Sequence, residues 1–174
     1  MVSKLVPLVL LVFLVCPLAA RPGPAMGPQG DDPQGRTERV KSGARHFDRA
    51  FYDLTPRKRD AEAAREFDLA VAEFEAELRE SPASVDAHRY LGRIFTLRKQ
   101  FRQAARHYDE VAGLQPGEVD ACVLSAAAWA DAGEFAEARA RLLKAKGRTS
   151  DPGALARLDE YLAKLDRRRP VPLP

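Results

Sequence analysis

Cysteine is scarce in this chain, and its scarcity excludes one way of holding a fold together. The 174 residues contain two cysteines, Cys16 and Cys122. Cys16 lies in an N-terminal segment with the layout of a cleaved export signal, so Cys122 alone would remain. A single cysteine cannot form an internal disulfide, and an intermolecular disulfide is the open alternative. We therefore expect a fold held by its apolar core, with Cys122 as a small buried hydrophobe.

A surplus of charge of one sign is also lacking. The 28 lysines and arginines and the 25 aspartates and glutamates give a formal net charge of +3. The two signs are interleaved along the chain, which is typical of a solvated helical surface. A nucleic-acid-binding domain needs a clustered basic face instead. We expect no nucleic-acid partner.

The residue sets that carry catalysis or metal binding are missing from the sequence. The three histidines, His46, His88 and His107, include no pair four residues apart, which is the spacing of a helical metal site. There is no glycine-rich phosphate loop and no serine or cysteine nucleophile motif. The sequence predicts a protein that is not an enzyme and has no cofactor or metal. We expect His88 in the core or at its edge, and His107 on the exposed side of its helix.

A long hydrophobic run occurs only at the N-terminus. After a basic start, residues 5–18 are almost entirely apolar, and small residues precede Arg21. This layout predicts a secretory signal peptide over residues 1–20, because the run is shorter than the roughly 20 residues of a membrane span. We expect an exported protein, periplasmic or secreted. An uncleaved anchor and a lipidated Cys16 are the alternatives, and only these would attach the chain to a membrane.

Proline and glycine are concentrated near the two ends. Residues 21–39 are expected to form a flexible linker and residues 167–174 a disordered tail. Between the ends, apolar residues recur every three or four positions, which predicts helices over 40–54 and about 59–80. Each is followed by a proline that ends it. No segment alternates with a period of two, so the fold class is all-α.

The chain resembles itself at an offset of 34 residues. The aligned positions are Phe67, Phe101 and Phe135; Ala70, Ala104 and Ala138; Phe74, Tyr108 and Leu142; Asp86-Ala87 and Asp120-Ala121; Phe95 and Trp129; and Pro82 and Pro116. A period of 34 residues with two helices per unit is typical of a helical solenoid. The last element of such an array needs a polar outer face. A helix over 151–166, opened by Asp151-Pro152, has one leucine stripe and is expected to be this cap.

At this period, the unit over residues 85–118 resembles the tetratricopeptide repeat. Leu91-Gly92, Ala104 and Pro116 match the pattern of that family, and His88, Phe95 and Tyr108 take the places of its large residues. The unit over 119–152 follows the same pattern more loosely. The resemblance implies a helix-turn-helix solenoid over 40–150, with the first helix of its first pair out of register by an insertion. A glycine in the middle of a helix, at position 92, is expected where a neighbouring helix comes close.

The resemblance also implies a concave face lined by the first helix of each pair. Nine residues on that stripe are expected to contact a partner: Arg89, Arg93, Thr96, Val123, Ala127, Ala130, Arg157, Tyr161 and Lys164. They would form a groove with basic flanks, a small apolar middle and one aromatic anchor. This predicts an exported adaptor or scaffold that binds a protein or an acidic peptide, because arginine pairs with carboxylates bidentately.

Two other interpretations stay open. Arg89 and Arg93 can simply pair with Asp86 and other local acids, since exposed ion pairs are common and weak. The chain can also be a structural component that self-assembles, or an assembly factor of the cell envelope held by its N-terminus.

Overall fold

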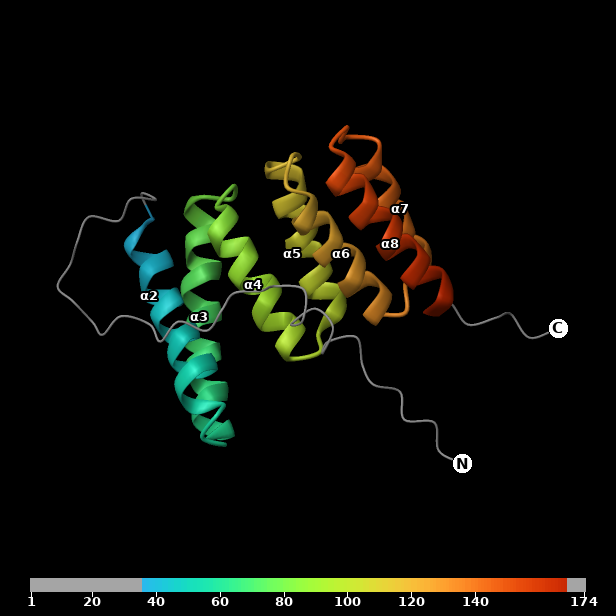
Figure 1. Ribbon diagram of the computed structural model, residues 1–174. Coiled ribbons are helices and arrows are strands. Elements are labelled where there is room, and N and C mark those ends of the chain that lie inside the picture. Colours follow the sequence, from blue (N-terminus) through green and yellow to red (C-terminus); the bar gives the residue numbers. More distant parts are fainter. Residues whose placement is uncertain (1–35, 169–174) are drawn as a thin grey trace, which may run out of the picture.

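The computed structural model describes residues 36–168, and all regular structure in this range is helical. The helices are α2 (Glu38–Asp48), η1 (Arg49–Leu54), α3 (Asp60–Glu80), α4 (Val85–Leu97), α5 (Phe101–Leu114), α6 (Val119–Asp131), α7 (Phe135–Lys146) and α8 (Pro152–Arg168). Figure 1 shows them as consecutive antiparallel pairs in a row, from α2 in blue to α8 in red. The predicted all-α repeat architecture is therefore confirmed. The predicted signal peptide, linker residues 21–35 and tail residues 169–174 lie outside the described range.

Two segments expected to be irregular are partly helical. Thr37 caps α2 by accepting the Val40 N–H at 3.2 Å, so the helix begins inside the predicted linker. The last helix, α8, runs two residues beyond its expected end, to Arg168. The Arg168 guanidinium lies 3.0 Å from the Asp131 carboxylate at the end of α6. Contacts with neighbouring helices therefore extend order into polar sequence whose composition alone indicates a loop.

The 34-residue repeat corresponds to equivalent buried positions in the second helix of each pair. Ala70, Ala104 and Ala138 are all 0% exposed, and they lie in α3, α5 and α7. The turns inside the pairs are also equivalent. Lys58, Lys99 and Gly133 have positive φ values of 56°, 58° and 84°, and the N–H of the residue that follows each of them donates to the carbonyl five residues earlier. One left-handed residue therefore closes the first helix of all three pairs.

The first pair is longer than the others. A Cβ at Gly43 would lie 2.8 Å from the Phe74 ring, and a Cβ at Gly92 would lie 2.7 Å from the Tyr108 ring. The two rings are 34 residues apart in sequence but the two glycines are 49 apart, so the first pair contains 15 additional residues. Lys58 divides them almost equally, which lengthens each helix by about two turns. Figure 1 shows this end of the α2–α3 pair, in teal, reaching past the neighbouring pairs.

Inside this extension, the helix expected over 40–54 is α-helical only to Asp48. From Arg49 to Leu54 it widens into a π-helix, η1. The Ala50 carbonyl accepts both the Thr55 N–H at 3.0 Å and the Thr55 hydroxyl at 2.8 Å. The following residue is Pro56, which has no N–H to continue the helix.

A half-buried ion pair joins the last two helix pairs. The Asp109 carboxylate of α5 accepts from Ser125 Oγ at 2.5 Å, from Trp129 Nε1 at 3.1 Å and from Arg141 Nη2 at 3.0 Å. These donors lie on α6 and α7, so one side chain fixes three helices. Helix α8 then packs against α7 and α6 through Leu158 and Leu165. None of the helices within residues 36–168 is long and apolar enough to cross a membrane.

Candidate partner-binding site

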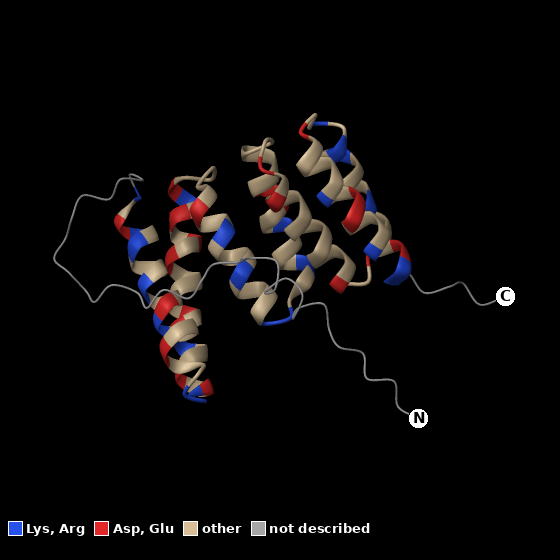
Figure 2. Cartoon of the chain, viewed as in Figure 1, with Lys and Arg blue, Asp and Glu red and all other residues tan. Residues whose placement is uncertain are grey.

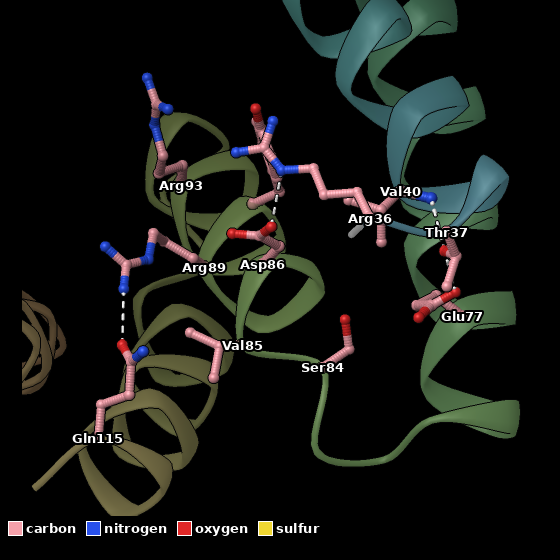
Figure 3. Close-up of a pocket in the computed structure, with 11 residues that line it drawn as sticks. Arg36, Thr37, Val40, Glu77, Ser84, Val85, Asp86, Arg89, Arg93 and Gln115 are labelled. Atoms are coloured by element: carbon pink, nitrogen blue, oxygen red, sulfur yellow. Dashed lines mark hydrogen bonds and ion pairs between the residues drawn. The ribbon is translucent and has the colours of Figure 1, made fainter. Parts of the chain in front are cut away.

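A cavity of about 590 Å³ lies between the N-terminal ends of α2 and α4. Its lining residues are Arg36, Thr37, Val40, Glu77, Ser84, Val85, Asp86, Arg89, Tyr90, Arg93 and Gln115. Figure 3 shows Arg89 and Arg93 on the α4 side, with Thr37 and Glu77 on the opposite wall. Elsewhere on the described helices, basic and acidic residues are interleaved, as Figure 2 shows. The α2/α4 cavity brings Arg36, Arg89 and Arg93 to one opening, together with the acids Glu77 and Asp86.

The far wall of the cavity is fixed by a buried glutamate. Glu77 of α3 is 3% exposed, and its Oε2 accepts the Thr37 hydroxyl proton at 2.6 Å. The same Thr37 oxygen accepts the Val40 N–H of α2. One threonine therefore satisfies a buried carboxylate and begins a helix, which holds α2 and α3 in a fixed relation at the cavity.

An ion pair crosses the cavity between the two first helices. Arg36 Nε lies 2.8 Å from Asp86 Oδ2, and both side chains are about one-third exposed. Arg36 falls in the predicted linker, and the sequence reasoning did not include it in the site. Composition could not identify it, because the proline- and glycine-rich stretch before it dominates that window.

Arg89 is bound by local partners. Its Nη2 lies 2.7 Å from the Glu118 carboxylate and 3.0 Å from Gln115 Oε1, while its Nη1 donates to Glu118 at 3.0 Å. Its Nε is buried and has no hydrogen-bond partner among the described residues. The alternative of local pairing thus holds for Arg89, although the acid is Glu118 and not Asp86.

Arg93 is different, because it forms no ion pair with any carboxylate of residues 36–168. Its guanidinium lies 4.6 Å from the ring centroid of Phe47 and 5.9 Å from that of Tyr90. Phe47 is 1% exposed and packs edge-on against Tyr90 at 5.3 Å, and Tyr90 stacks on Phe74 at 4.8 Å. A guanidinium that lies over an aromatic ring and has no carboxylate partner among the described residues keeps N–H groups available for an oxygen ligand.

The positive charge of Arg93 nevertheless acts on one nearby acid, Asp48. Burial raises the pKa of the Asp48 carboxyl at the end of α2, and the Arg93 and Arg36 guanidinium groups oppose that rise.

The other residues expected to contact a partner do not line this cavity. Thr96 donates its hydroxyl proton to the Gly92 carbonyl at 2.8 Å, within its own helix. Val123, Ala127 and Ala130 are 8%, 8% and 4% exposed, so they offer little surface to a partner.

On the last helix, the remaining predicted residues have partners of their own. Arg157 pairs with Asp120 at 3.0 Å. Lys164 pairs with Glu160 at 2.7 Å and lies over the Tyr161 ring at 5.1 Å. The structure therefore brings Arg89 and Arg93 together with Arg36 and Tyr90 at the α2/α4 cavity, and the other seven predicted residues lie outside this cavity.

The two histidines of the second pair meet, which the sequence reasoning missed. His88 Nδ1 lies 3.0 Å from His107 Nδ1, and His88 Nε2 donates to the Pro82 carbonyl at 3.0 Å. His107 also stacks on Phe95 at 5.4 Å and is partly buried, so its expected exposed position is wrong. Burial, together with the neighbouring His88, lowers the pKa of His107 to about 4. Within residues 36–168 no group of three or more metal-ligating side chains forms. We interpret His88 and His107 as packing residues.

Cys122 is 7% exposed and lies in the core between α6 and its neighbours. Burial raises the pKa of the Cys122 thiol. A buried thiol of raised pKa is a poor nucleophile, in keeping with the small apolar role expected for it.

Comparison with known proteins gives structural likeness alone. No family model matches the chain, and no curated protein does. Among solved structures, the N-terminal domain of stress-induced protein-1 (STI-1) from C. elegans is 10% identical, with a TM-score of 0.49, covering 73% of this chain and 99% of that chain. A mutant of MamA is 16% identical, with a TM-score of 0.44, covering 75% of this chain and 89% of that chain. The tetratricopeptide-like architecture of the chain therefore rests on its own helix pairs and their 34-residue period.

Proposed function

We propose that this chain is an exported protein-interaction module, an adaptor or scaffold, that binds an acidic peptide segment of a partner at the α2/α4 cavity. One observation carries the proposal. The Arg93 guanidinium is held on the Phe47 ring at 4.6 Å, beside the cavity, without a carboxylate partner among the described residues.

The physical reason is preorganisation. An arginine that is already immobilised loses less side-chain entropy when it binds a carboxylate. Its planar edge matches the two oxygens of that carboxylate. Arg36 and Arg89 add positive potential around the same opening, although each is already paired with an acid. A carboxylate entering the cavity would therefore pair chiefly with Arg93.

The predicted export signal supports the export part of this proposal. The buried or locally paired state of the other predicted contact residues favours α4 as the position of the partner. The absence of a catalytic constellation in the sequence favours binding over catalysis.

The test is a titration of the ¹⁵N-labelled chain with a hexapeptide that contains two adjacent aspartates, followed by amide chemical shifts. Arg93→Gln should weaken binding by at least about tenfold, because one charge-assisted hydrogen-bonded pair contributes about 1.5–3 kcal/mol. Arg102→Gln is the matched control, since Arg102 is exposed on α5 and pairs with Glu134 away from the cavity. The asparagine form of the peptide should not bind. Equal affinities for the two arginine variants would refute the role of Arg93.

A further inference from the structure

A second cavity, of about 340 Å³, lies between α5, α6 and α7 and shares no residue with the α2/α4 cavity. Its lining residues are Asp109, Ala112, Gly113, Cys122, Ala140, Arg141, Lys144 and Arg148. Three cations and one acid give these residues a net charge of +2. The volume is at the lower end of the range of small-molecule sites, which is roughly 300–1,000 Å³.

The acid of this α5/α6/α7 cavity does not neutralise all of its cations. Asp109 already accepts from three donors, one of which is Arg141 at 3.0 Å. Lys144 and Arg148 form no ion pair with any carboxylate of residues 36–168. Two positive charges at the cavity are therefore without a counter-ion in the part of the chain that the structure describes.

The three cations lie on one face of α7 and of the turn that follows it. Arg141, Lys144 and Arg148 are three and four residues apart, which is the spacing of one helix face. Helix α7 ends at Lys146, but Gly147 keeps a right-handed helical conformation, with φ of −72° and ψ of −8°. Arg148 therefore continues the same face.

The other walls of the cavity are small and neutral. A Cβ at Gly113 of α5 would meet nothing within 4 Å, so there is open space beside this residue. Burial raises the pKa of the Cys122 thiol, and the charges of Arg148 and Lys144 oppose that rise. The thiol is therefore neutral and does not repel an anion, while both unpaired cations act on the wall that it forms.

We propose that the α5/α6/α7 cavity binds a phosphate monoester of a small organic molecule, with Lys144 and Arg148 at the phosphate and the small neutral residues at the carbon skeleton. A phosphate monoester carries a charge of about −1.5 to −2 at neutral pH and has three strong acceptor oxygens. It therefore matches two unpaired cations, whereas a carboxylate carries one charge and two oxygens. This site is independent of the proposed function of the α2/α4 cavity.

The experiment is a titration of the ¹⁵N-labelled chain with n-propyl phosphate at low salt, followed by the amide shifts of α5 and α7. Lys144→Gln and Arg148→Gln should each weaken binding about tenfold, because each removes a charge-assisted hydrogen bond to the phosphate. Lys146→Gln is the matched control, since Lys146 lies in the same last turn but pairs with Asp159 at 2.6 Å. Equal weakening in all three variants would assign the effect to net charge and overturn the proposal.

Gly113→Leu tests the cavity from the wall opposite the cations. Leucine favours a helix more than glycine does, so the variant should stay folded, which far-ultraviolet circular dichroism checks. Its side chain should occupy the open space and weaken the binding of n-propyl phosphate at least tenfold. An unchanged affinity would contradict the location of the site.

Three other ligands identify the occupant. Propanol should not bind, and sulfate, which has a similar charge but no carbon skeleton, should bind several times more weakly than n-propyl phosphate. If sulfate binds as tightly, the cavity holds an adventitious ion only and the proposal is overturned. Tighter binding of a capped phosphoserine peptide would assign the cavity to a phosphorylated protein and would also overturn it. Arg93→Gln should leave the affinity for n-propyl phosphate unchanged, because Arg93 lines the other cavity.

Discussion

Replacing Gly92 with alanine tests how closely the second helix pair is packed. A Cβ at position 92 would lie 2.7 Å from Tyr108 Cε1 and 2.9 Å from Tyr108 Cζ. Carbon atoms in contact stand about 3.5–4.0 Å apart. The Tyr108 ring is 4% exposed, so it has little room to retreat. The close approach expected for this glycine is therefore made by a side chain of the neighbouring helix, and not by its backbone.

The magnitude follows from two opposing effects. Alanine favours the helix over glycine by about 1 kcal/mol. Overpacking a dense core costs about 1–3 kcal/mol. The free energy of unfolding should thus fall by up to about 2 kcal/mol. Gly113→Ala is the matched control, because a Cβ at Gly113 meets nothing within 4 Å and should only stabilise α5.

The next repeat supplies a compensating change. Thirty-four residues on, Ala126 and Leu142 stand where Gly92 and Tyr108 stand. The double variant Gly92→Ala, Tyr108→Leu reproduces that natural combination. We expect the two changes to be coupled favourably by about 1–2 kcal/mol, since adjacent core residues are seldom additive.

Urea denaturation followed by far-ultraviolet circular dichroism measures all four proteins of this cycle. The reasoning is wrong if Gly92→Ala stabilises the chain as much as Gly113→Ala does, or if the two changes in the cycle are simply additive.

Two further predictions concern polar groups in the core. Asp109→Ala should lower the free energy of unfolding by about 3 kcal/mol in the same denaturation assay, because it leaves the buried Ser125 hydroxyl and the Arg141 guanidinium without their acceptor; a loss below about 1 kcal/mol would contradict this. His107, with its pKa lowered to about 4 in the folded chain from an ordinary value of 6.5, binds fewer protons folded than unfolded between these values. Its contribution is therefore complete above about pH 6.5 and is lost as the pH falls toward 4, by about 1–3 kcal/mol for a partly buried ring. The difference in stability between the unaltered chain and His107→Gln, measured from pH 7 to pH 4, should fall accordingly, and a constant difference would contradict the assignment.

The fold could be predicted because its determinants repeat. Buried alanines at 70, 104 and 138 recur at one offset, and each marks a helix face that its neighbour must approach. A repeat period can be recognised in the sequence without knowing which distant residues are in contact. The first helix of the array escaped this comparison because 15 additional residues separate Gly43 from the register of Gly92. Only the structure shows that α2 is equivalent to α4, because Gly43 lies against the Phe74 ring as Gly92 lies against the Tyr108 ring.

The site was predictable only in part, because a helix stripe does not tell which side chains are already occupied. Arg89 and Arg93 have the same type and share one stripe, yet Glu118 binds the first and an aromatic ring supports the second. The partners come from α2 and from the turn after α5, which no local pattern connects. Ala127 and Ala130 follow the same stripe into the core, where neighbouring helices cover them.

The proposed binding site lies where the array departs from its own 34-residue repeat. Thirty-four residues after Arg93 stands Ala127, so the next pair offers no cation at that place. Phe47 of α2 lies under the Arg93 guanidinium. The equivalent position in α4 is Thr96, because Gly43 and Gly92 are equivalent and 49 residues apart, and threonine has no aromatic ring. The combination of a guanidinium and its supporting ring therefore occurs between α2 and α4 and is not repeated between α4 and α6. Residues that recur with the 34-residue period form the core. A surface that is specific for one partner needs residues that do not recur with that period.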